Sequence, residues 1–234
     1  MITRLSELSA SLSDSLVDSD LQSVTVELAE SLADTLLDDG LAKDIPVIGT
    51  IYGLAKFGVS VRDRLFLKKL LYFISELSQV SVEERATMIS RIDQSGKYRV
   101  KVGEKLLYIL DKSEDHENAR IVAHLFSAFV SATLSYDEFL RACRGIQSVM
   151  TDDLWSFVEG EEDRWPVSAV GNLLSAGLCE IENPEIRVEN EWDSDRSSKY
   201  RVEGTELTAY ISDLGKKIRS ILRFRRTTTK PDNT

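Results

Sequence analysis

The two histidines are the residues best suited to acid–base or metal chemistry. His116 and His124 lie eight residues apart on or near one predicted helix. With ~1.5 Å of rise per residue, they are too far apart along the axis to share a metal ion. His116 follows Asp115 at a helix start, where we expect exposure, and His124 lies between Val122 and Leu125 in a core pattern. Neither histidine predicts a catalytic site.

The other chemical motifs are incomplete. A segment with the alternating spacing of a calcium loop has His at its sixth position and Val at its twelfth, so the sharp turn and the bidentate ligand are missing. The oxygen-bearing residues of this segment are Asp111, Ser113, Asp115 and Glu117. Cys143 and Cys179 form no CxxC pair, which predicts buried free thiols. Nucleophile and phosphate-loop signatures are lacking. We therefore predict a protein without catalytic residues, metal ligands or a cofactor.

A glycine-punctuated apolar run leads directly into a basic amphipathic helix. The run covers residues 45–61 and contains one charged residue, Lys56, while the predicted helix covers residues 62–77. Glycines on a helix surface allow close packing of another backbone, and basic side chains beside an apolar run suit an anionic surface. The candidate partner or membrane surface comprises Gly49, Gly53, Phe57, Arg62, Arg64, Lys68 and Lys69. Burial in the protein's own core is the alternative interpretation.

An acidic segment precedes this run. Residues 1–44 carry ten acidic and two basic side chains, and leucines at helical spacing predict two helices, the second over Val24–Leu36. Residues 45–82 carry five basic and two acidic side chains, so the two segments are complementary in charge. The acidic arm could cover the basic helix, or both could be faces of one bundle. Because residues 1–16 lack an export signal, we expect a cytoplasmic protein.

Residues 45–150 predict an α-helical bundle. Capping boxes at Ser81 with Glu84 and at Ser135 with Glu138 mark two helix starts. Further helices are expected at residues 104–110, 117–133 and 136–150. Residues 97–102 alternate polar and apolar side chains, and we favour a helical turn there over a short strand.

Residues 151–226 have a different pattern, that of a winged-helix-like module. A helix is expected over Val167–Ala176, ending at Gly177. Strands over Leu178–Ile181 and Lys199–Val202 would form a small β-hairpin, followed by a helix whose apolar stripe begins at Leu207. Residues 227–234 are expected to be a disordered tail. The predicted fold class is therefore mainly α, a helical bundle followed by this module.

The charges of the module disfavour DNA as its partner. The helix that would enter the major groove contains no Lys or Arg, and only Asn172 could contact a base. The loop over residues 180–196 has seven acids and would lie against phosphates. A basic cluster near the chain end could instead contact an anionic surface or nucleic acid. That cluster comprises Lys216, Lys217, Arg219, Arg223, Arg225 and Arg226.

Several of these features together resemble a known family. They are the segment Ile45–Thr50, the helix Arg62–Phe73 that follows it, and a hairpin that begins at Gly177 and Leu178 and closes on Tyr200 and Thr205. The combination resembles small bacterial helical proteins of the Abi-alpha type of abortive-infection family. That resemblance implies a bacterial cytoplasmic protein in phage defence, without an assigned activity or site residue. The long acidic N-terminal arm departs from it.

We conclude from the sequence that the protein is a non-enzymatic interaction or regulatory protein whose winged-helix module docks protein instead of DNA. A protein partner or a homo-oligomer is expected. Two alternatives stay open. One is a membrane-active effector that uses residues 45–74 and associates with the membrane on activation, and the other is nucleic-acid binding through the basic C-terminal cluster.

Overall fold

The computed structural model describes most of the chain. The described residues are 2–18, 45–54, 60–78, 80–98, 100–182, 187–192, 198–203 and 207–229. For residues 2–4, 187–192, 198–203 and 225–229 only the backbone is described. The predicted helix over Val24–Leu36 lies outside the described residues, as does Phe57.

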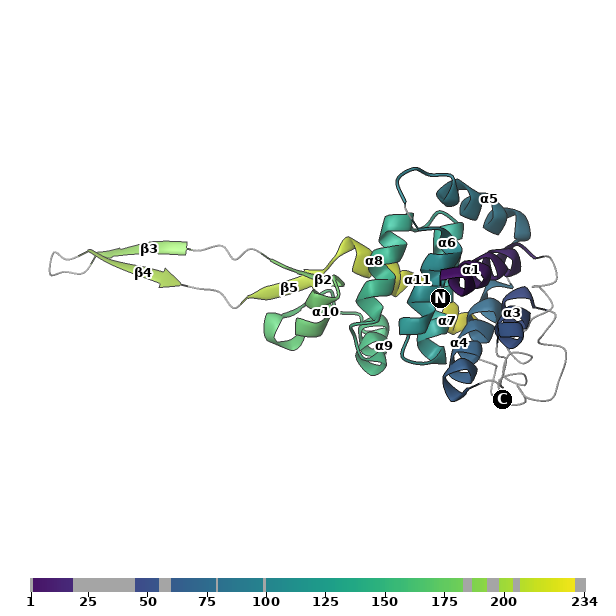
Figure 1. Ribbon diagram of the computed structural model, residues 1–234. Coiled ribbons are helices and arrows are strands. Elements are labelled where there is room, and N and C mark those ends of the chain that lie inside the picture. The colour runs from purple at the N-terminus through teal and green to yellow at the C-terminus, as the bar shows by residue number, and fades with distance from the viewer. Residues whose placement is uncertain are drawn as a thin grey trace. The chain divides into compact units, whose positions relative to one another are not determined.

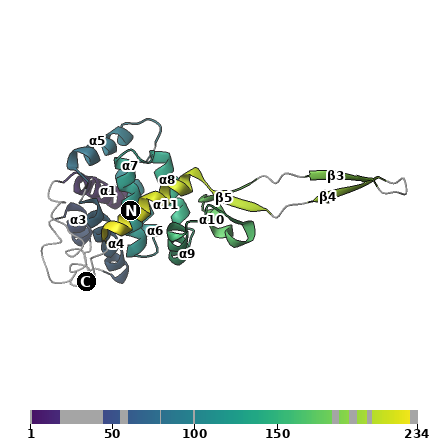
Figure 2. The same ribbon diagram turned by 180° about the vertical axis from the view of Figure 1, so that it is seen from behind.

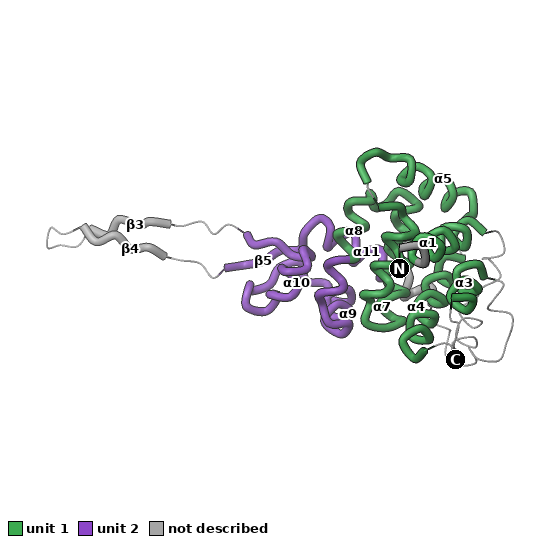
Figure 3. Tube along the Cα trace, in the orientation of Figure 1, with its two compact units in different colours: residues 1–143, 224–234 green, residues 144–223 purple. Residues whose placement is uncertain are grey.

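The chain divides into two compact units. The N-terminal unit comprises Met1–Cys143 with Phe224–Thr234, and the C-terminal unit comprises Arg144–Arg223, as Figure 3 shows in two colours. The division falls inside two helices, α8 (Tyr136–Ile146) and α11 (Asp213–Thr229). Helices dominate the described residues and the sheet is small, which confirms the predicted mainly α class.

The N-terminal unit is entirely helical over its described elements, which Figures 1 and 2 show gathered in one bundle. Before α8 they are α1 (Ile2–Val17), α3 (Pro46–Leu54), α4 (Val61–Leu77), α5 (Val82–Asp93), α6 (Val102–Lys112) and α7 (His116–Val130). Pro46 occupies the first position of α3, where a missing N–H is harmless. Of the alternating residues 97–102, Lys97 lies in a turn and Val102 is the first residue of α6, and no strand is described among those that the structure describes.

Side-chain caps define where several of these helices begin. The Oγ of Ser81 accepts a hydrogen bond from the backbone N–H of Glu84 at the start of α5. At α8 the box is complete, because Glu138 N donates to Ser135 Oγ and Ser135 N donates to Glu138 Oε2. The predicted capping box is confirmed at Ser135, whereas at Ser81 the serine cap is confirmed but Glu84 Oε2 accepts from the Ser81 hydroxyl group at 2.9 Å.

Helix α7 lies at the centre of the core. Every residue from Asn118 to Val130 except Arg120 is buried, and the helix packs against α4. A cluster of aromatic rings joins α4, α7 and α8, with centroid distances of 5.6 to 5.9 Å between successive members. Its members are Phe73, Phe126, Phe129 and Phe139. A helix buried on all sides explains why residues 117–133 show no polar face.

Helix α1 joins this unit through serines as well as leucines. Leu12 and Leu16 are fully buried, and α1 packs against α3, α5 and α6. The backbone N–H of Val47 donates to Ser15 Oγ at 3.0 Å. The backbone of α6 comes so close at Gly103 that an added Cβ would lie 2.7 Å from the carbonyl oxygen of Ser9. The first predicted helix is therefore part of the bundle.

The connection from α7 to α8 contains an unusual backbone conformation. Ala132 has φ of 59°, in the left-handed region. The N–H groups of Thr133 and Leu134 both donate to the carbonyl oxygen of Ala128, at 2.8 and 3.1 Å. This pattern ends α7 in the manner that glycine usually provides, with alanine in its place.

The C-terminal unit combines short helices with two small sheets (Figure 1). Between α8 and α11 its elements are α9 (Thr151–Glu159), β1 (Arg164–Pro166), the 3-10 helix η3 (Val167–Ala169), α10 (Gly171–Ser175), β2 (Cys179–Ile181), β3 (Arg187–Trp192), β4 (Ser198–Glu203) and β5 (Thr208–Ile211). The helix expected over Val167–Ala176 is thus divided into η3 and α10, while Gly177, with φ of 73°, ends it as predicted.

The strand pairing differs from the expected hairpin. Strand β5 lies between β1 and β2 in an antiparallel sheet, with Tyr210 opposite both Arg164 and Glu180. Among the strands that the structure describes, β3 and β4 pair only with each other. The two predicted strands therefore exist but do not pair together. The final helix begins at Asp213, so the first residues of its predicted apolar stripe, from Leu207 to Ile211, belong instead to β5 and the residue before it.

Helix α11 follows the sheet directly and buries Ile218 and Leu222. It continues to Thr229, so the first three residues of the expected disordered tail are helical, and residues 230–234 lie outside the described part.

Candidate functional site

The glycines of the apolar run lie on α3. Gly49 is half-buried, and its backbone N–H donates to the carbonyl oxygen of Ile45 at 2.9 Å. Gly53 is exposed, and a Cβ added there would meet no heavy atom within 4 Å. Val47, Ile48 and Ile51 of the same helix are buried in the N-terminal unit. Helix α3 thus buries its aliphatic side in the bundle and leaves Gly53 open.

A capping box that was not predicted from the sequence starts α4. Ser60 Oγ accepts from Asp63 N, and Asp63 Oδ2 accepts from Ser60 N at 3.0 Å. The hydrogen bonds from Ser60 lower the pKa of the Asp63 carboxyl group. The S-x-x-D pattern at residues 60–63 is the sequence signal for this cap, and it indicates a helix start one residue before the predicted start at Arg62. This cap fixes Val61 as the first residue of α4.

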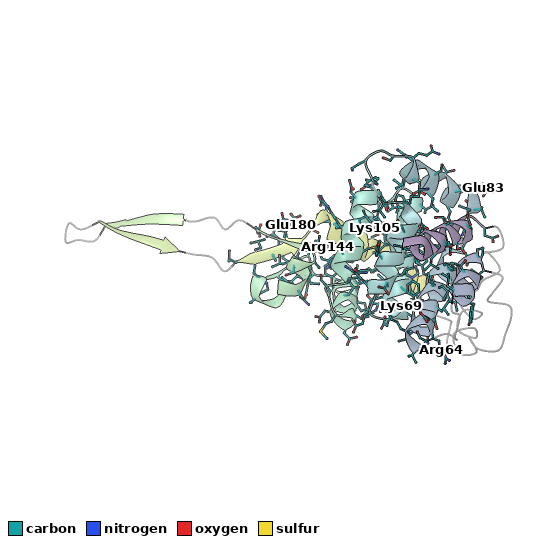
Figure 4. The ribbon with its side chains drawn as sticks, in the orientation of Figure 1. Arg64, Lys69, Glu83, Lys105, Arg144 and Glu180 are labelled. Carbon is teal, nitrogen blue, oxygen red and sulfur yellow. The ribbon has the colours of Figure 1, made fainter. Side chains whose placement is uncertain are left out.

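The four cations of α4 have different surroundings. Arg62 is highly exposed and lies 3.5 Å from Asp111 at the end of α6. Lys69 Nζ donates to the carbonyl oxygens of Asp111 and Ser113, which end α6. Lys68 Nζ lies 5.9 Å from the ring centroid of Tyr72. Arg64 is exposed, and Figure 4 labels it with Lys69 on this helix. The structure brings all four together on α4.

Two aliphatic side chains lie exposed among these cations. Val61 is 72% exposed and Leu65 is 58% exposed, although the later turns of α4 are buried. Their exposure could not be predicted from the sequence, because a spacing of four residues fits the apolar stripe of any packed helix.

A buried polar cluster joins α4 to α7. Arg120 Nε donates to Glu76 Oε1 at 2.8 Å, and His124 Nδ1 lies 3.6 Å from Glu76 Oε2. Burial disfavours the charge on Arg120, but the hydrogen bond and the negative charge of Glu76 outweigh it and raise the pKa of Arg120. Glu76 is almost fully buried. We interpret the buried pair of Glu76 and Arg120 as a structural ion pair.

The histidines themselves take the positions expected of them. His124 is buried, and His116 is partly exposed at the start of α7. The His116 ring contacts the Tyr72 ring with centroids 4.8 Å apart. Among the described residues, no three His, Cys, Asp or Glu side chains gather as a metal site requires.

Two arginines of the basic C-terminal cluster form hydrogen bonds within the C-terminal unit. Arg219 is only 6% exposed and donates to the carbonyl oxygens of Phe157 and Glu162 and to Asp163 Oδ1. Its guanidinium also lies 4.6 Å from the Phe157 ring centroid. Arg223 donates to the carbonyl oxygens of Val158, Glu159 and Gly160. These two arginines therefore satisfy the carbonyl groups that end α9.

The other cations of this cluster are placed by α11. Lys216 Nζ lies 3.1 Å from Asp213 Oδ1 in the first turn, and Lys217 is partly exposed. Arg225 and Arg226 lie in the last part of α11, where the backbone alone is described. The six residues predicted as one anionic-surface contact thus have different roles along the helix.

The solvent-facing side of the β1–β5–β2 sheet carries a row of polar side chains. Tyr210 Oη donates to Glu180 Oε2 at 3.0 Å, which raises the pKa of Tyr210, and Arg164 Nη1 donates to Glu182 Oε2 at 2.8 Å. An open groove of about 500 Å³ runs beside this row, lined in part by Ile181 and Lys216. Ile181 is exposed at the edge strand β2. Figure 4 labels Glu180 on this strand.

A second groove of about 540 Å³ lies along α11 and shares Asp163, Ile211 and Lys216 with the first. Arg219 and Arg223 line its other part. The two grooves are therefore adjoining parts of one polar surface on the C-terminal unit.

The residues expected to face DNA have no basic character. Helix α10 exposes Gly171, Asn172 and Ser175. The side-chain amide of Asn172 donates to Asp153 Oδ2 at 2.6 Å, and its Oδ1 accepts from the Leu173 N–H. The one candidate base-contacting side chain is thus occupied by the protein itself.

Comparisons with family models, curated proteins and solved structures gave no match for this chain. None of the described helices has the length and apolar character needed to cross a bilayer.

Proposed function

We propose that the protein is a non-enzymatic interaction protein whose C-terminal unit is a winged-helix-like module that docks onto protein instead of DNA. The observation that carries the proposal is the pairing of Asn172 with Asp153 on a helix without cations. The resemblance to abortive-infection proteins would place such a partner in phage defence.

The order of elements supports the winged-helix-like description. Helix α10 is followed by strand β2, a long connection that contains β3 and β4, the return strand β5, and α11. Strand β1 precedes α10 and completes the order β1-β5-β2. Two adjacent antiparallel strands after a helix, with an extended connection between them, are the elements of a wing.

The charges support a protein partner. A module that binds DNA through such a helix needs cations that neutralise phosphates, and η3 and α10 supply none. On the sheet side, Arg164 is already paired with Glu182, and Glu180 and Asp163 add negative charge. Arg219 and Arg223 serve α9, as described above. The nucleic-acid alternative therefore has to rest on Lys216, Lys217, Arg225 and Arg226.

The sheet face is the surface we assign to the partner. Tyrosine and arginine are common at the energetic centres of protein interfaces. Here Tyr210 lies at the centre of the row with Arg164 beside it, and Ile181 offers exposed aliphatic surface at the edge. The groove of about 500 Å³ adds a concave region in which a partner side chain could be enclosed.

Pull-down with the tagged full-length chain tests this proposal. A partner should be retained by the wild type and by a Tyr108→Ala control, whose exposed tyrosine lies on α6, and lost with Tyr210→Ala plus Ile181→Ser. Low-salt binding to random-sequence duplex DNA is measured in parallel. DNA binding that the Asn172→Ala variant loses would contradict the proposal.

A further inference from the structure

We propose that the first two turns of α4 form a contact surface for an anionic lipid bilayer, used while the N-terminal unit stays folded. This α4 surface is defined by the exposed aliphatic side chains of Val61 and Leu65 and by the cations Arg62, Arg64, Lys68 and Lys69. The inference is independent of the function proposed for the C-terminal unit.

The spacing of the aliphatic pair places it at the centre of the surface. Val61 and Leu65 are four residues apart, so they lie one above the other on the same side of the helix. They are 72% and 58% exposed, whereas Leu67 and Leu70 of the same helix are fully buried. The helix therefore has an inner face bound to the bundle and a separate outer face that is also aliphatic.

Cations flank this pair on both sides. Arg64 and Lys68 lie four residues apart along one flank, and Arg62 and Lys69 lie seven residues apart along the other. The acid within these two turns, Asp63, points to neither flank, because it is bonded to Ser60 as the helix cap. The four cations thus surround the two aliphatic side chains without a carboxylate from the same turns between them.

The partners of the flanking cations are compatible with contact to lipid. Arg62 and Asp111 are 3.5 Å apart with side chains 84% and 52% exposed, so water already competes with their attraction. Lys69 Nζ donates to carbonyl oxygens at the end of α6, and Lys68 Nζ lies near the Tyr72 ring. Long cationic side chains can keep their aliphatic stems along an apolar surface while their charges reach headgroups.

A bilayer fits this arrangement better than a nucleic acid does. The cations alone would suffice to bind a phosphate backbone, whereas the exposed Val61 and Leu65 side chains are stabilised by a hydrocarbon environment. An anionic leaflet supplies negative charge on all sides of a shallow aliphatic insertion. Because Leu67, Leu70 and Phe73 hold α4 in the core, the contact needs no release of the helix from the bundle. It also needs no membrane-crossing segment.

Co-sedimentation of the full-length chain with phosphatidylcholine vesicles, with and without phosphatidylserine, tests the inference at low and high salt. The wild type should bind only the vesicles that contain phosphatidylserine, and less at high salt. Arg64→Glu with Lys68→Glu should weaken binding about tenfold or more, because two attractive charges become repulsive. Val61→Ser with Leu65→Ser should weaken it about tenfold while the salt dependence persists.

Matched variants control for charge, exposure and folding. Lys101→Glu with Lys105→Glu makes the same charge change at the N-terminal end of α6, where acids suit the helix dipole, and Figure 4 labels Lys105. Met150→Ser removes an aliphatic side chain that is 72% exposed, as Val61 is. Both controls should bind within about twofold of the wild type, and circular dichroism should be unchanged in every variant.

Three outcomes would overturn the inference. The first is a wild type that binds neither kind of vesicle. The second is a wrong pattern among the variants. Either the charge control loses as much vesicle binding as Arg64→Glu with Lys68→Glu, or Val61→Ser with Leu65→Ser loses none. The third is preference for beads coated with polyglutamate over phosphatidylserine vesicles, with the same variant pattern, which would assign the α4 surface to an acidic protein.

Discussion

Arg120 Nε on α7 lies 2.8 Å from Glu76 Oε1 on α4, and this pair joins two helices that pack against each other in the core. The second oxygen of Glu76 faces His124. Because the Glu76 side chain is 3% exposed, water can hardly replace the hydrogen bond that Arg120 donates to it.

Glu76→Gln should therefore destabilise the protein by about 2 to 3 kcal/mol, since the charge of Arg120 loses its buried partner. Urea denaturation measures the effect. Glu117→Gln is the matched control, because Glu117 lies 3.6 Å from the same arginine but is 35% exposed, and it should cost about 0.5 kcal/mol or less. If both variants lost the same free energy of unfolding, burial would not determine how strongly Arg120 is paired.

The Ser60–Asp63 cap should make the free energy of unfolding depend on pH. The pKa of Asp63 is lower in the folded protein than its ordinary value of 3.8. Its contribution is present above the unfolded pKa and is lost as the pH falls through the lower folded pKa. Asp63→Asn should therefore lose stability relative to the wild type at neutral pH, and the difference should shrink below about pH 4. Chemical denaturation across that pH range provides the measurement.

Ala132→Gly should stabilise the protein by about 1 kcal/mol. Ala132 has φ of 59°, a conformation in which the Cβ is crowded and which glycine adopts freely. The residue is exposed, so the substitution removes little packing. A thermal unfolding midpoint that falls or stays constant would contradict the strain assigned to this turn.

Two glycine substitutions should have opposite signs. Gly103→Ala places a Cβ 2.4 Å from Ser13 Oγ and 2.7 Å from the Ser9 carbonyl oxygen, so α1 and α6 must separate at a cost of about 1 to 3 kcal/mol. Gly53→Ala adds a methyl group in open space on α3 and should stabilise by about 0.5 kcal/mol. Urea denaturation of both variants alongside the wild type separates steric conflict from helix propensity.

Arg219→Lys should destabilise the C-terminal unit by about 2 kcal/mol, although it conserves the charge. A lysine cannot reproduce the planar fork that reaches Phe157, Glu162 and Asp163 together. Lys216→Ala on the same helix should change stability by about 0.5 kcal/mol or less, because Lys216 makes an exposed pair with Asp213. Thermal unfolding of the full chain tests both expectations.

Local signals in the sequence predicted the features that depend on near neighbours. The caps at Ser81 and Ser135 and the helix end at Gly177 involve residues within a few positions of one another, and all three were found as expected. Strand β5 was missed because Leu207, Tyr210 and Ile211 continue the helical spacing of α11. Its register is set by β1 and β2, which lie far away in the sequence.

The candidate sites also divide into those formed by near neighbours in the sequence and those formed by distant residues. The cations of α4 could be predicted as a group because one helix carries them, whereas the pairing of Glu76 with Arg120 spans 44 residues. The sequence does indicate that Glu76 has a partner. Glu76 is an isolated acid near Phe73, Ile74 and Leu77, and a charge in an apolar stripe requires a partner. The identity of that partner follows only from the packing of α4 on α7.

The serine-rich contact of α1 has a consequence for how the bundle opens. Hydroxyl groups at Ser9 and Ser15 occupy buried positions that would otherwise hold hydrocarbon, so fewer apolar contacts hold α1 than hold α7. In native-state hydrogen exchange, the amides of α1 should therefore exchange through a sub-global opening at lower free energy than those of α7. The N-terminal helix would then be the first cooperative segment to detach, while the aromatic core beneath it stays closed.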